Sequence, residues 1–255
     1  MSKNLTISLV QTTQYWENVI ANLSHLEEKI ASEVSDHSDL IVFPELFNTG
    51  FSMNVSEPMN STTHKWMKQI AAQYNTHLIG SLAIMEQKLK YNRALIVNSK
   101  SETLIYNKKH LFALGKENEC FTPGTEKIVF TIKNWKIQPF ICYDLRFPVW
   151  CRNTEVDLLV FVASWPKTRI LAWKTLLKAR AIENQCYVIG VNRIGTDGNQ
   201  LVYNGQSLII DYEGNELLNA EEKNEILTYS LDYENLRNYR SKLPFYKDAD
   251  QFDLK

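Results

Sequence analysis

The stretch Ile137-Gln138-Pro139-Phe140-Ile141-Cys142-Tyr143-Asp144-Leu145-Arg146-Phe147-Pro148 decides the fold, because an apolar run in it ends at a cysteine. A short apolar run with Ile and Phe predicts a buried strand, and the charged residues and proline after Cys142 mark where the chain leaves the sheet. We therefore expect Cys142 at the carboxyl end of a strand, where open α/β sheets bind ligands. Free cysteine is also among the most buried residue types and can serve as a small hydrophobic side chain, so this stretch alone leaves its role open.

The composition is that of an ordinary globular protein. The chain has 255 residues, of which 44% are hydrophobic and 22% charged, so it is long enough to bury a core without disulfides or metals. We predict one domain over residues 1–255. With 28 basic and 29 acidic residues the net charge is -1, which gives no electrostatic attraction for nucleic acid or an anionic membrane, and we expect neither as a partner.

The cysteine and histidine spacing argues against a metal site. The cysteines, Cys120, Cys142, Cys151 and Cys186, contain no C-x-x-C pair, and the histidines form no H-x-x-x-H pair near them. We expect neither a disulfide framework nor a metal. A cytoplasmic location fits, since the sequence begins with no basic and apolar leader, has no apolar run as long as a membrane span, and carries thiols suited to a reducing compartment.

Strand-like and helix-like stretches alternate along the chain, which predicts an α/β fold. Pro44 cannot donate a hydrogen bond to a sheet, so the strand that reaches it should stop there and leave Glu45 at its carboxyl end. The glycines of Gly195-Thr196-Asp197-Gly198 predict a turn. We expect strands at 5–10, 39–44, 77–85, 94–98, 103–106, 137–141, 157–163, 187–191, 207–210 and 225–230, and helices at 21–34, 61–73 and 170–185.

Several common catalytic motifs are absent from the sequence. It has no G-x-S-x-G, G-x-G-x-x-G or G-x-x-x-x-G-K stretch, which excludes the serine-hydrolase elbow and the usual dinucleotide and nucleotide phosphate loops. Arg146 follows Cys142 too closely for a cysteine phosphatase loop, in which a longer span is closed by arginine, and Pro148 occupies that later position. A thiol at Cys142 would therefore lack a phosphate cradle.

Four short motifs, taken in order, resemble those of one enzyme family. They are Phe43-Pro44-Glu45, Lys108-Lys109-His110-Leu111, Glu117 at its distance from Gly124, and residues 142–148, with further matches at 179–185 and 192–195. Together they span most of the chain, which is similar to members of the nitrilase, or carbon–nitrogen hydrolase, superfamily. The resemblance implies a four-layer αββα sandwich, commonly paired as a homodimer through helices near the site, and a Glu-Lys-Cys triad at Glu45, Lys108 and Cys142.

These residue types suit the hydrolysis of an amide. A free thiol is mostly protonated at neutral pH, so Cys142 needs a base during attack, and Glu45 is the candidate. Lys108 and the backbone N–H of Tyr143 would stabilise the oxyanion, and Glu117 would orient Lys108 and keep it charged. The protonated carboxyl would then pass its proton to departing ammonia and activate water against the thioester. No metal or organic cofactor is required.

Each of the outer residues also has an ordinary structural interpretation. Glu45 can be a solvated residue at the start of the next segment, Lys108 part of an exposed basic face, and Glu117 part of a surface loop. A binding module that retains these residues for packing therefore stays open as the alternative to an enzyme. One shared site, however, explains four motifs in the family's order, so we predict an enzyme.

The sequence around Cys142 looks most like the bacterial ω-amidase branch of the family. That resemblance implies hydrolysis of short 2-oxo acid ω-amides, such as 2-oxoglutaramate and 2-oxosuccinamate. Because these substrates carry a carboxylate far from the scissile amide, we expect Arg169 to bind it and Trp165 to form an aromatic wall, on a loop that opens near the cysteine. A helix-capping Arg169 and a core Trp165 are the alternative, and nitriles, N-carbamoyl compounds and other short amides stay open as substrates.

Overall fold

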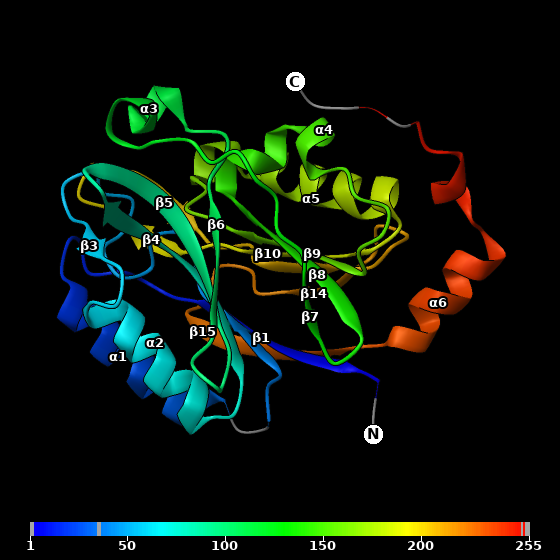
Figure 1. The fold of residues 1–255 in the computed structure, drawn as a ribbon, viewed down its shortest axis with the longest axis horizontal. Helices are drawn as coiled ribbons and strands as arrows, with labels where there is room; N and C mark the ends of the chain where they lie inside the picture. Colours follow the sequence, from blue (N-terminus) through cyan, green and yellow to red (C-terminus); the bar gives the residue numbers. More distant parts are fainter. Residues whose placement is uncertain (1–2, 35–36, 251, 253–255) are drawn as a thin grey trace.

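Two β-sheets stacked face to face form the centre of the protein, and helices cover their outer faces (Figure 1). The computed structural model describes residues 3–34, 37–250 and 252. Within these residues, none of the helices has the length and apolar character needed to cross a membrane. The α-helices are α1 (Val19–Glu33), α2 (Thr62–Gln73), α3 (Glu117–Cys120), α4 (Pro148–Cys151), α5 (Ile170–Asn184) and α6 (Tyr233–Lys242), and the 3-10 helices are η1 (Ala113–Gly115), η2 (Cys142–Arg146), η3 (Lys167–Arg169) and η4 (Phe245–Asp248).

The first sheet brings the ends of two separated strands to one edge. Its order is β15 (Glu225–Leu231), β1 (Leu5–Gln11), β2 (Leu40–Val42), β4 (His77–Glu86), β5 (Leu89–Val97) and β6 (Thr103–Asn107), with β3 (Glu57–Pro58) also paired to β4. β2 and β4 are parallel, and both the β4–β5 and β5–β6 pairs are antiparallel. Consequently β6 runs in the same direction as β2, and the carboxyl ends of both lie at the same edge.

The second sheet has three parallel strands at its centre. Its order is β14 (Glu216–Asn219), β13 (Leu208–Ile210), β10 (Tyr187–Val191), β9 (Leu158–Val162), β8 (Trp135–Ile141) and β7 (Phe130–Ile132). β8, β9 and β10 pair in parallel, so their carboxyl ends also share one edge. A separate hairpin pairs β11 (Ile194–Thr196) with β12 (Val202–Asn204).

Period-two alternation divides the side chains of the first sheet between two cores. Leu40 and Val42 of β2 belong to the core between the two sheets, whereas Ile41 packs in the core beneath α1 and α2. The second sheet contributes Trp135 and Tyr187 to the central core, where their ring centres lie 5.7 Å apart. Each face of the first sheet is therefore buried, one against the second sheet and the other against helices.

Helix α5 lies close against the outer face of the second sheet. Gly190 of β10 makes this approach possible, because a Cβ at that position would lie 2.5 Å from Leu177 and 2.6 Å from Trp173 of the helix. With α1 and α2 on one side and α5 on the other, the layers are helix, sheet, sheet and helix (Figure 1). The expected four-layer αββα sandwich is confirmed.

Two differences from the predicted strands concern residues 87–93 and 194–199, besides the short strands β3, β7, β12 and β14, which were not predicted. β5 begins at Leu89 rather than at residue 94, so it includes the polar residues Asn92 and Arg93, both of which are buried. The turn before β5 has positive φ at Gln87 and Lys88, which is typical of a tight hairpin. Residues 194–196 form strand β11, so the turn predicted at 195–198 lies further along, at 198–199.

Candidate active site

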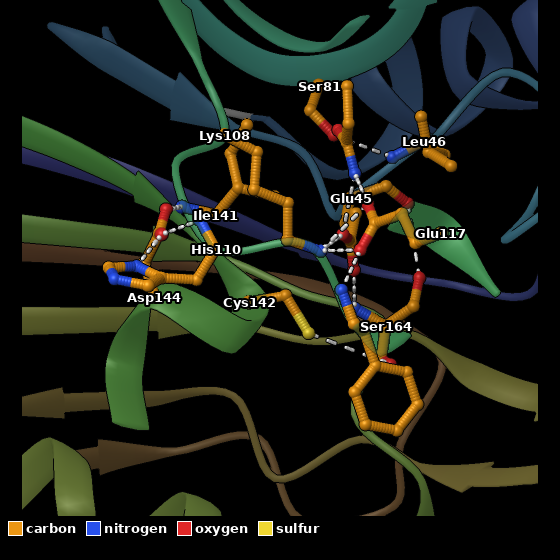
Figure 2. Close-up of polar contacts among 12 residues, drawn as sticks. Glu45, Leu46, Ser81, Lys108, His110, Glu117, Ile141, Cys142, Asp144 and Ser164 are labelled. Atoms are coloured by element: carbon orange, nitrogen blue, oxygen red, sulfur yellow. Dashed lines mark hydrogen bonds and ion pairs between the residues drawn. The ribbon is translucent and has the colours of Figure 1, made fainter. Parts of the chain in front are cut away.

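The site lies where strands of both sheets end. Glu45 follows β2 and Lys108 follows β6, and the shared direction of these strands brings both residues to one edge of the first sheet. Cys142 follows β8, and Ser164 comes shortly after β9, at the corresponding edge of the second sheet. Figure 2 shows these residues converging on one another. The loops that follow four strands therefore supply the site, as is usual at the carboxyl ends of parallel strands.

Cys142 occupies a sharp turn between β8 and η2. Its φ is 44°, in the left-handed region that residues other than glycine rarely adopt, so the backbone is strained there. The buried Asp144 holds this turn, because its Oδ2 accepts the backbone N–H of Ile141 at 3.1 Å. Its Oδ1 accepts the backbone N–H of His110 at 3.0 Å and lies 2.8 Å from the ring Nδ1 (Figure 2). Asp144 thus ties the cysteine turn to the segment that carries Lys108.

The ammonium group of Lys108 is buried between two carboxylates. Its Nζ lies 2.7 Å from Oε1 of Glu45, and 3.0 and 2.8 Å from Oε1 and Oε2 of Glu117 (Figure 2). Burial alone would lower the pKa of Lys108, but the charges of Glu117 and Glu45 together outweigh it and raise the pKa. Lys108 is therefore a protonated donor at neutral pH.

Glu117 is buried and is not part of an exposed loop. It is the first residue of α3, and Lys116 before it has a φ of 57°, a left-handed turn that changes the direction of the chain. Its Oε2 also accepts the backbone N–H of Phe112 at 2.7 Å. Within residues 3–34 and 37–250, no group of three or more His, Cys, Asp or Glu side chains is arranged to hold a metal ion. The space between Glu45 and Glu117 is occupied by the ammonium of Lys108.

Asn92 of β5 is a member of the site that the sequence analysis missed. Its side-chain Nδ2 donates to Oε1 of Glu45 at 2.8 Å and to Oε1 of Glu117 at 2.8 Å. The side chain is fully buried. The available signal was a pair of polar residues, Asn92 and Arg93, just before the predicted strand at 94–98. Because that prediction started the strand too late, Asn92 was left outside it.

Ser164 connects Glu45 to Cys142. Its backbone N–H donates to Oε2 of Glu45 at 3.0 Å, and its carbonyl oxygen lies 3.9 Å from the sulfur of Cys142 (Figure 2). Burial raises the pKa of the Cys142 thiol well above its usual value, and the charge of Glu45 raises it further. Burial also raises the pKa of Glu45, against the opposing effect of Lys108. A protonated thiol therefore lies beside a carboxyl group with an increased affinity for protons.

A cavity opens onto Cys142 and Lys108. Two arginines line it: the guanidinium of Arg146 lies 4.9 Å from the ring centre of Trp165, and that of Arg169 lies 5.3 Å from the ring centre of Phe112. In the part of the chain that the structure describes, neither guanidinium forms an ion pair. Aromatic side chains form much of the remaining wall: Phe51, Phe112, Tyr143, Trp165 and Tyr203.

The structure brings the two predicted substrate-binding residues to this cavity. Arg169 and Trp165 both line it, and the indole N–H of Trp165 donates to the carbonyl of Arg169 at 2.9 Å. Trp165 also packs against Trp173 in the core, so its side chain both lines the cavity and belongs to the core. Arg146 was named from the sequence in the cysteine motif and in the argument against a phosphatase loop, but not as a substrate-binding residue. The structure adds it to the cavity.

Lys108 and its neighbour Lys109 point to different places. Lys108 is buried in the site, whereas Nζ of Lys109 lies 5.4 Å from the ring centre of Trp150, beside a separate surface hollow.

Tyr143 lines the cavity and follows Cys142 in the first turn of η2. The backbone N–H groups in the first turn of a helix have no carbonyl partner within that helix. A backbone donor therefore stands next to the sulfur.

Comparison with known proteins assigns this fold and site to a class. The family model for carbon–nitrogen hydrolases matches residues 6–241, and the chain belongs to that family. It is 39% identical over 254 residues to the omega-amidase YafV of Escherichia coli (strain K12), with 98% of each chain covered. It is 32% identical over 252 residues to the 2-oxoglutaramate amidase of Bacillus subtilis (strain 168), covering 95% of this chain and 96% of the relative. The protein is an amidase, a hydrolase of carbon–nitrogen bonds in linear amides.

Solved structures agree with this assignment. The XC1258 protein of Xanthomonas campestris, a member of the superfamily with an arsenic adduct in its active site, is 37% identical and superposes with a TM-score of 0.96 over 99% of both chains. Nit3 of Saccharomyces cerevisiae, described as a member of branch 10 of the nitrilase superfamily, is 25% identical with a TM-score of 0.83 over 96% of both chains. The αββα sandwich is thus the family fold.

Proposed function

We propose that the protein hydrolyses the terminal amide of short 2-oxo acid ω-amides, such as 2-oxoglutaramate and 2-oxosuccinamate, to the acid and ammonia. The single observation that carries this proposal is the pair of guanidinium groups, Arg146 and Arg169, in the cavity that opens onto Cys142. An ω-amide of a 2-oxo acid has a carboxylate at the end opposite its amide. The cavity offers the thiol of Cys142 to the amide end and unpaired guanidinium groups to the carboxylate end.

In the proposed mechanism Cys142 is the nucleophile and Glu45 the base. Because burial raises the pKa of Cys142, the thiol is neutral at rest, and Glu45 removes its proton as the sulfur attacks the amide carbon. The protonated Glu45 then gives that proton to the departing ammonia, which leaves a thioester on Cys142. Water, activated by the same carboxylate, attacks the thioester and releases the acid and the thiol.

Lys108 and the backbone N–H of Tyr143 stabilise the oxyanion in this proposal. Lys108 is fully buried and keeps its charge, and a donor fixed in place before the reaction needs no reorganisation when charge develops on the carbonyl oxygen. One such donor typically lowers the barrier by about 3 kcal/mol. Glu117 would hold Lys108 in place, since both of its oxygens are already bound by donors.

For the substrate carboxylate we propose Arg169, with Trp165 as the wall against the short carbon chain. Arg169 lines the cavity, and its planar group can bind both carboxylate oxygens. Arg146 is the second cation of the same cavity. It is the last residue of η2, the 3-10 helix that begins at Cys142.

The test of the substrate class is ammonia release by purified enzyme. ω-Amides of 2-oxo dicarboxylic acids are compared with uncharged amides of equal length, and with a short nitrile and an N-carbamoyl compound. We expect kcat/KM for the charged ω-amides to be at least about a hundredfold higher, because a site built to bind a polar group rejects analogues that lack it. Equal kcat/KM for charged and uncharged amides would overturn the substrate class.

We also propose that the protein is a homodimer. The outer face of α5 exposes the apolar side chains of Leu171 and Ile182, and α4 exposes Val149. A second copy would remove this apolar surface from water. Light scattering coupled to size-exclusion chromatography should give twice the chain mass of 29.6 kDa, and a mass of one chain at micromolar concentration would overturn the proposal.

A cytoplasmic location is proposed on the chemistry of the cysteines. Cys120, Cys142, Cys151 and Cys186 are all free thiols, and the proposed nucleophile must stay reduced to act. Fractionation of the host cell with immunodetection tests this proposal. Recovery in an extracytoplasmic fraction would contradict it.

A further inference from the structure

We propose that Asn92 is a positioning residue that directs its two amide hydrogens to Glu45 and Glu117 and thereby sets the pH range in which Glu45 acts as a base. This inference rests on the proposed roles of Glu45 and Cys142. Asn92 lies in the middle of β5, with Nδ2 at 2.8 Å from Oε1 of each glutamate. It is the side chain of this strand that contacts both carboxylates around Lys108.

The contacts determine which way the Asn92 amide faces. An ionised carboxylate only accepts hydrogen bonds, so the NH₂ group must face Glu45 and Glu117, and the opposite orientation would place a carbonyl oxygen against two acceptors. The remaining atom, Oδ1 of Asn92, is buried and has no hydrogen-bond partner among the described residues. Leaving a buried carbonyl unpaired costs free energy, which is the expected consequence of holding both hydrogens on the carboxylates.

The charges around Glu45 explain why a neutral donor is useful. Lys108 is one cation between two carboxylates, so the ionised cluster carries one surplus negative charge. The other titratable groups that act on Glu45 or respond to its charge are the Cys142 thiol and the Tyr203 hydroxyl, and neither is a cation. Within the described residues, the backbone N–H of Ser164 and the thiol of Cys142 are the other neutral donors to this carboxylate.

A donor on the ionised form favours that form. Asn92 therefore opposes the burial that raises the pKa of Glu45, and it does so without a second positive charge that would weaken the base. Loss of the donor should raise the pH at which Glu45 gives up its proton. A purely structural role, in which Asn92 only joins β5 to α3, would lower activity at every pH equally.

The experiment is the pH profile of Asn92→Leu, which keeps the branched side chain of four heavy atoms and removes both donors. We expect the acidic limb of kcat/KM to move to higher pH by about one unit, the size expected when a hydrogen bond to a charged group is lost. A second readout needs no substrate. The rate at which iodoacetamide alkylates Cys142, followed by peptide mass, should show the same shift, because it also depends on a base beside the thiol.

Two further variants keep the test decisive. Asn92→Val removes the donors with a side chain that favours strands, and it decides the question if Asn92→Leu does not fold. Asn48→Leu is the matched control, because Asn48 is buried and donates to Oε2 of Glu57 at 2.8 Å and to Oγ1 of Thr63 at 3.0 Å, away from the cavity lining. Its acidic limb should stay at the wild-type position.

Folded Asn92 variants whose limbs match wild type in both readouts would overturn the proposal. Failure of the substrate assignment is a separate result. If wild type releases no ammonia from ω-amides, the alkylation profile of Cys142 still compares Asn92→Leu with wild type. A shifted alkylation limb then supports the role of Asn92, and an unshifted one rejects it.

Discussion

Lys108 and Glu117 form a two-pronged buried contact, with Nζ at 3.0 Å from Oε1 and 2.8 Å from Oε2. Lys108 follows a strand of the first sheet, and Glu117 begins a short helix nine residues later, so the pair joins two elements across the site. A buried ammonium is stable only beside opposite charge. Glu117 and Glu45 together therefore compensate the buried charge of Lys108 beside the cavity.

The first prediction follows from this pair. In Glu117→Gln the ammonium of Lys108 keeps one carboxylate instead of two, so the pKa of Lys108 falls and its position is less fixed. We expect kcat to fall by at least about tenfold, with a smaller change in KM, because the oxyanion donor acts mainly in the transition state. Steady-state kinetics measures the effect, and circular dichroism checks folding. An unchanged kcat in a folded variant would remove Glu117 from the proposed mechanism.

The second prediction concerns the nucleophile. Cys142→Ala should abolish turnover and retain the fold, because the sulfur makes the bond to the substrate while the turn itself is held by Asp144. Intact-mass spectrometry after brief exposure to substrate should show an acyl adduct on wild type and none on the variant. Cys120→Ala is the control, since Cys120 is exposed and should leave the adduct in place. Full activity of Cys142→Ala would refute the assignment.

The third prediction separates Lys108 from Lys109. Lys108→Met should lose at least about a hundredfold in kcat because an oxyanion donor is removed. Lys109→Met should retain activity, since the Lys109 ammonium lies over the ring of Trp150 outside the site. Parallel kinetic assays on the two variants give the ranking. The opposite ranking would show that the proposed oxyanion donor is the wrong lysine.

The positions of Glu45 and Cys142 were predictable from the sequence for a simple physical reason. Pro44 cannot extend a ladder, and the apolar run before Cys142 ends at charged residues, so both residues were assigned to the carboxyl ends of strands. The structure has them there. Alternation of strands and helices likewise indicated the α/β class, while the pairing of two sheets into a sandwich came from the family resemblance.

Other features could not be read from the sequence. Asn92 lies inside a strand, where a polar residue argues against a strand unless its buried partners are known. Arg146 reaches the cavity because η2 turns its side chain that way, which no spacing rule predicts. Helix α6 was missed because its sequence is mostly polar and its N-terminus depends on a local cap, in which Asp232 accepts the backbone N–H of Asn235 at 2.9 Å.

The fourth prediction connects the burial of Glu45 to stability. Its pKa is raised above the usual value of 4.5, so the folded protein binds this proton more tightly than the unfolded chain. The resulting stabilisation is present below the unfolded pKa and is lost as the pH rises through the folded pKa. Glu45→Gln should therefore melt at a higher temperature than wild type near neutral pH. The corresponding gain in the free energy of unfolding is on the order of 1 kcal/mol for each unit by which folding raises the pKa of Glu45.

The same difference should shrink as the pH falls towards the unfolded pKa, because wild type is then protonated too. Thermal melts of both proteins at about pH 7.5 and at about pH 4.5 measure it. Glu119→Gln is the control, since Glu119 is exposed and its replacement should not change stability in a pH-dependent way. Equal melting temperatures of wild type and Glu45→Gln near neutral pH would contradict the prediction.

The last prediction tests which residue binds the substrate carboxylate. Arg169→Ala should lower kcat/KM for a charged ω-amide by at least about tenfold and leave an uncharged amide of equal length nearly unaffected, because only the charged substrate loses a partner. Lys167→Ala is the matched control: Lys167 is a nearby cation whose Nζ lies 3.7 Å from Glu222 rather than in the cavity. If Arg146→Ala removes the charge preference and Arg169→Ala does not, the carboxylate binds at Arg146, next to Cys142. If both variants keep the wild-type preference, the carboxylate is recognised elsewhere, and the pair of guanidinium groups no longer supports the ω-amide assignment.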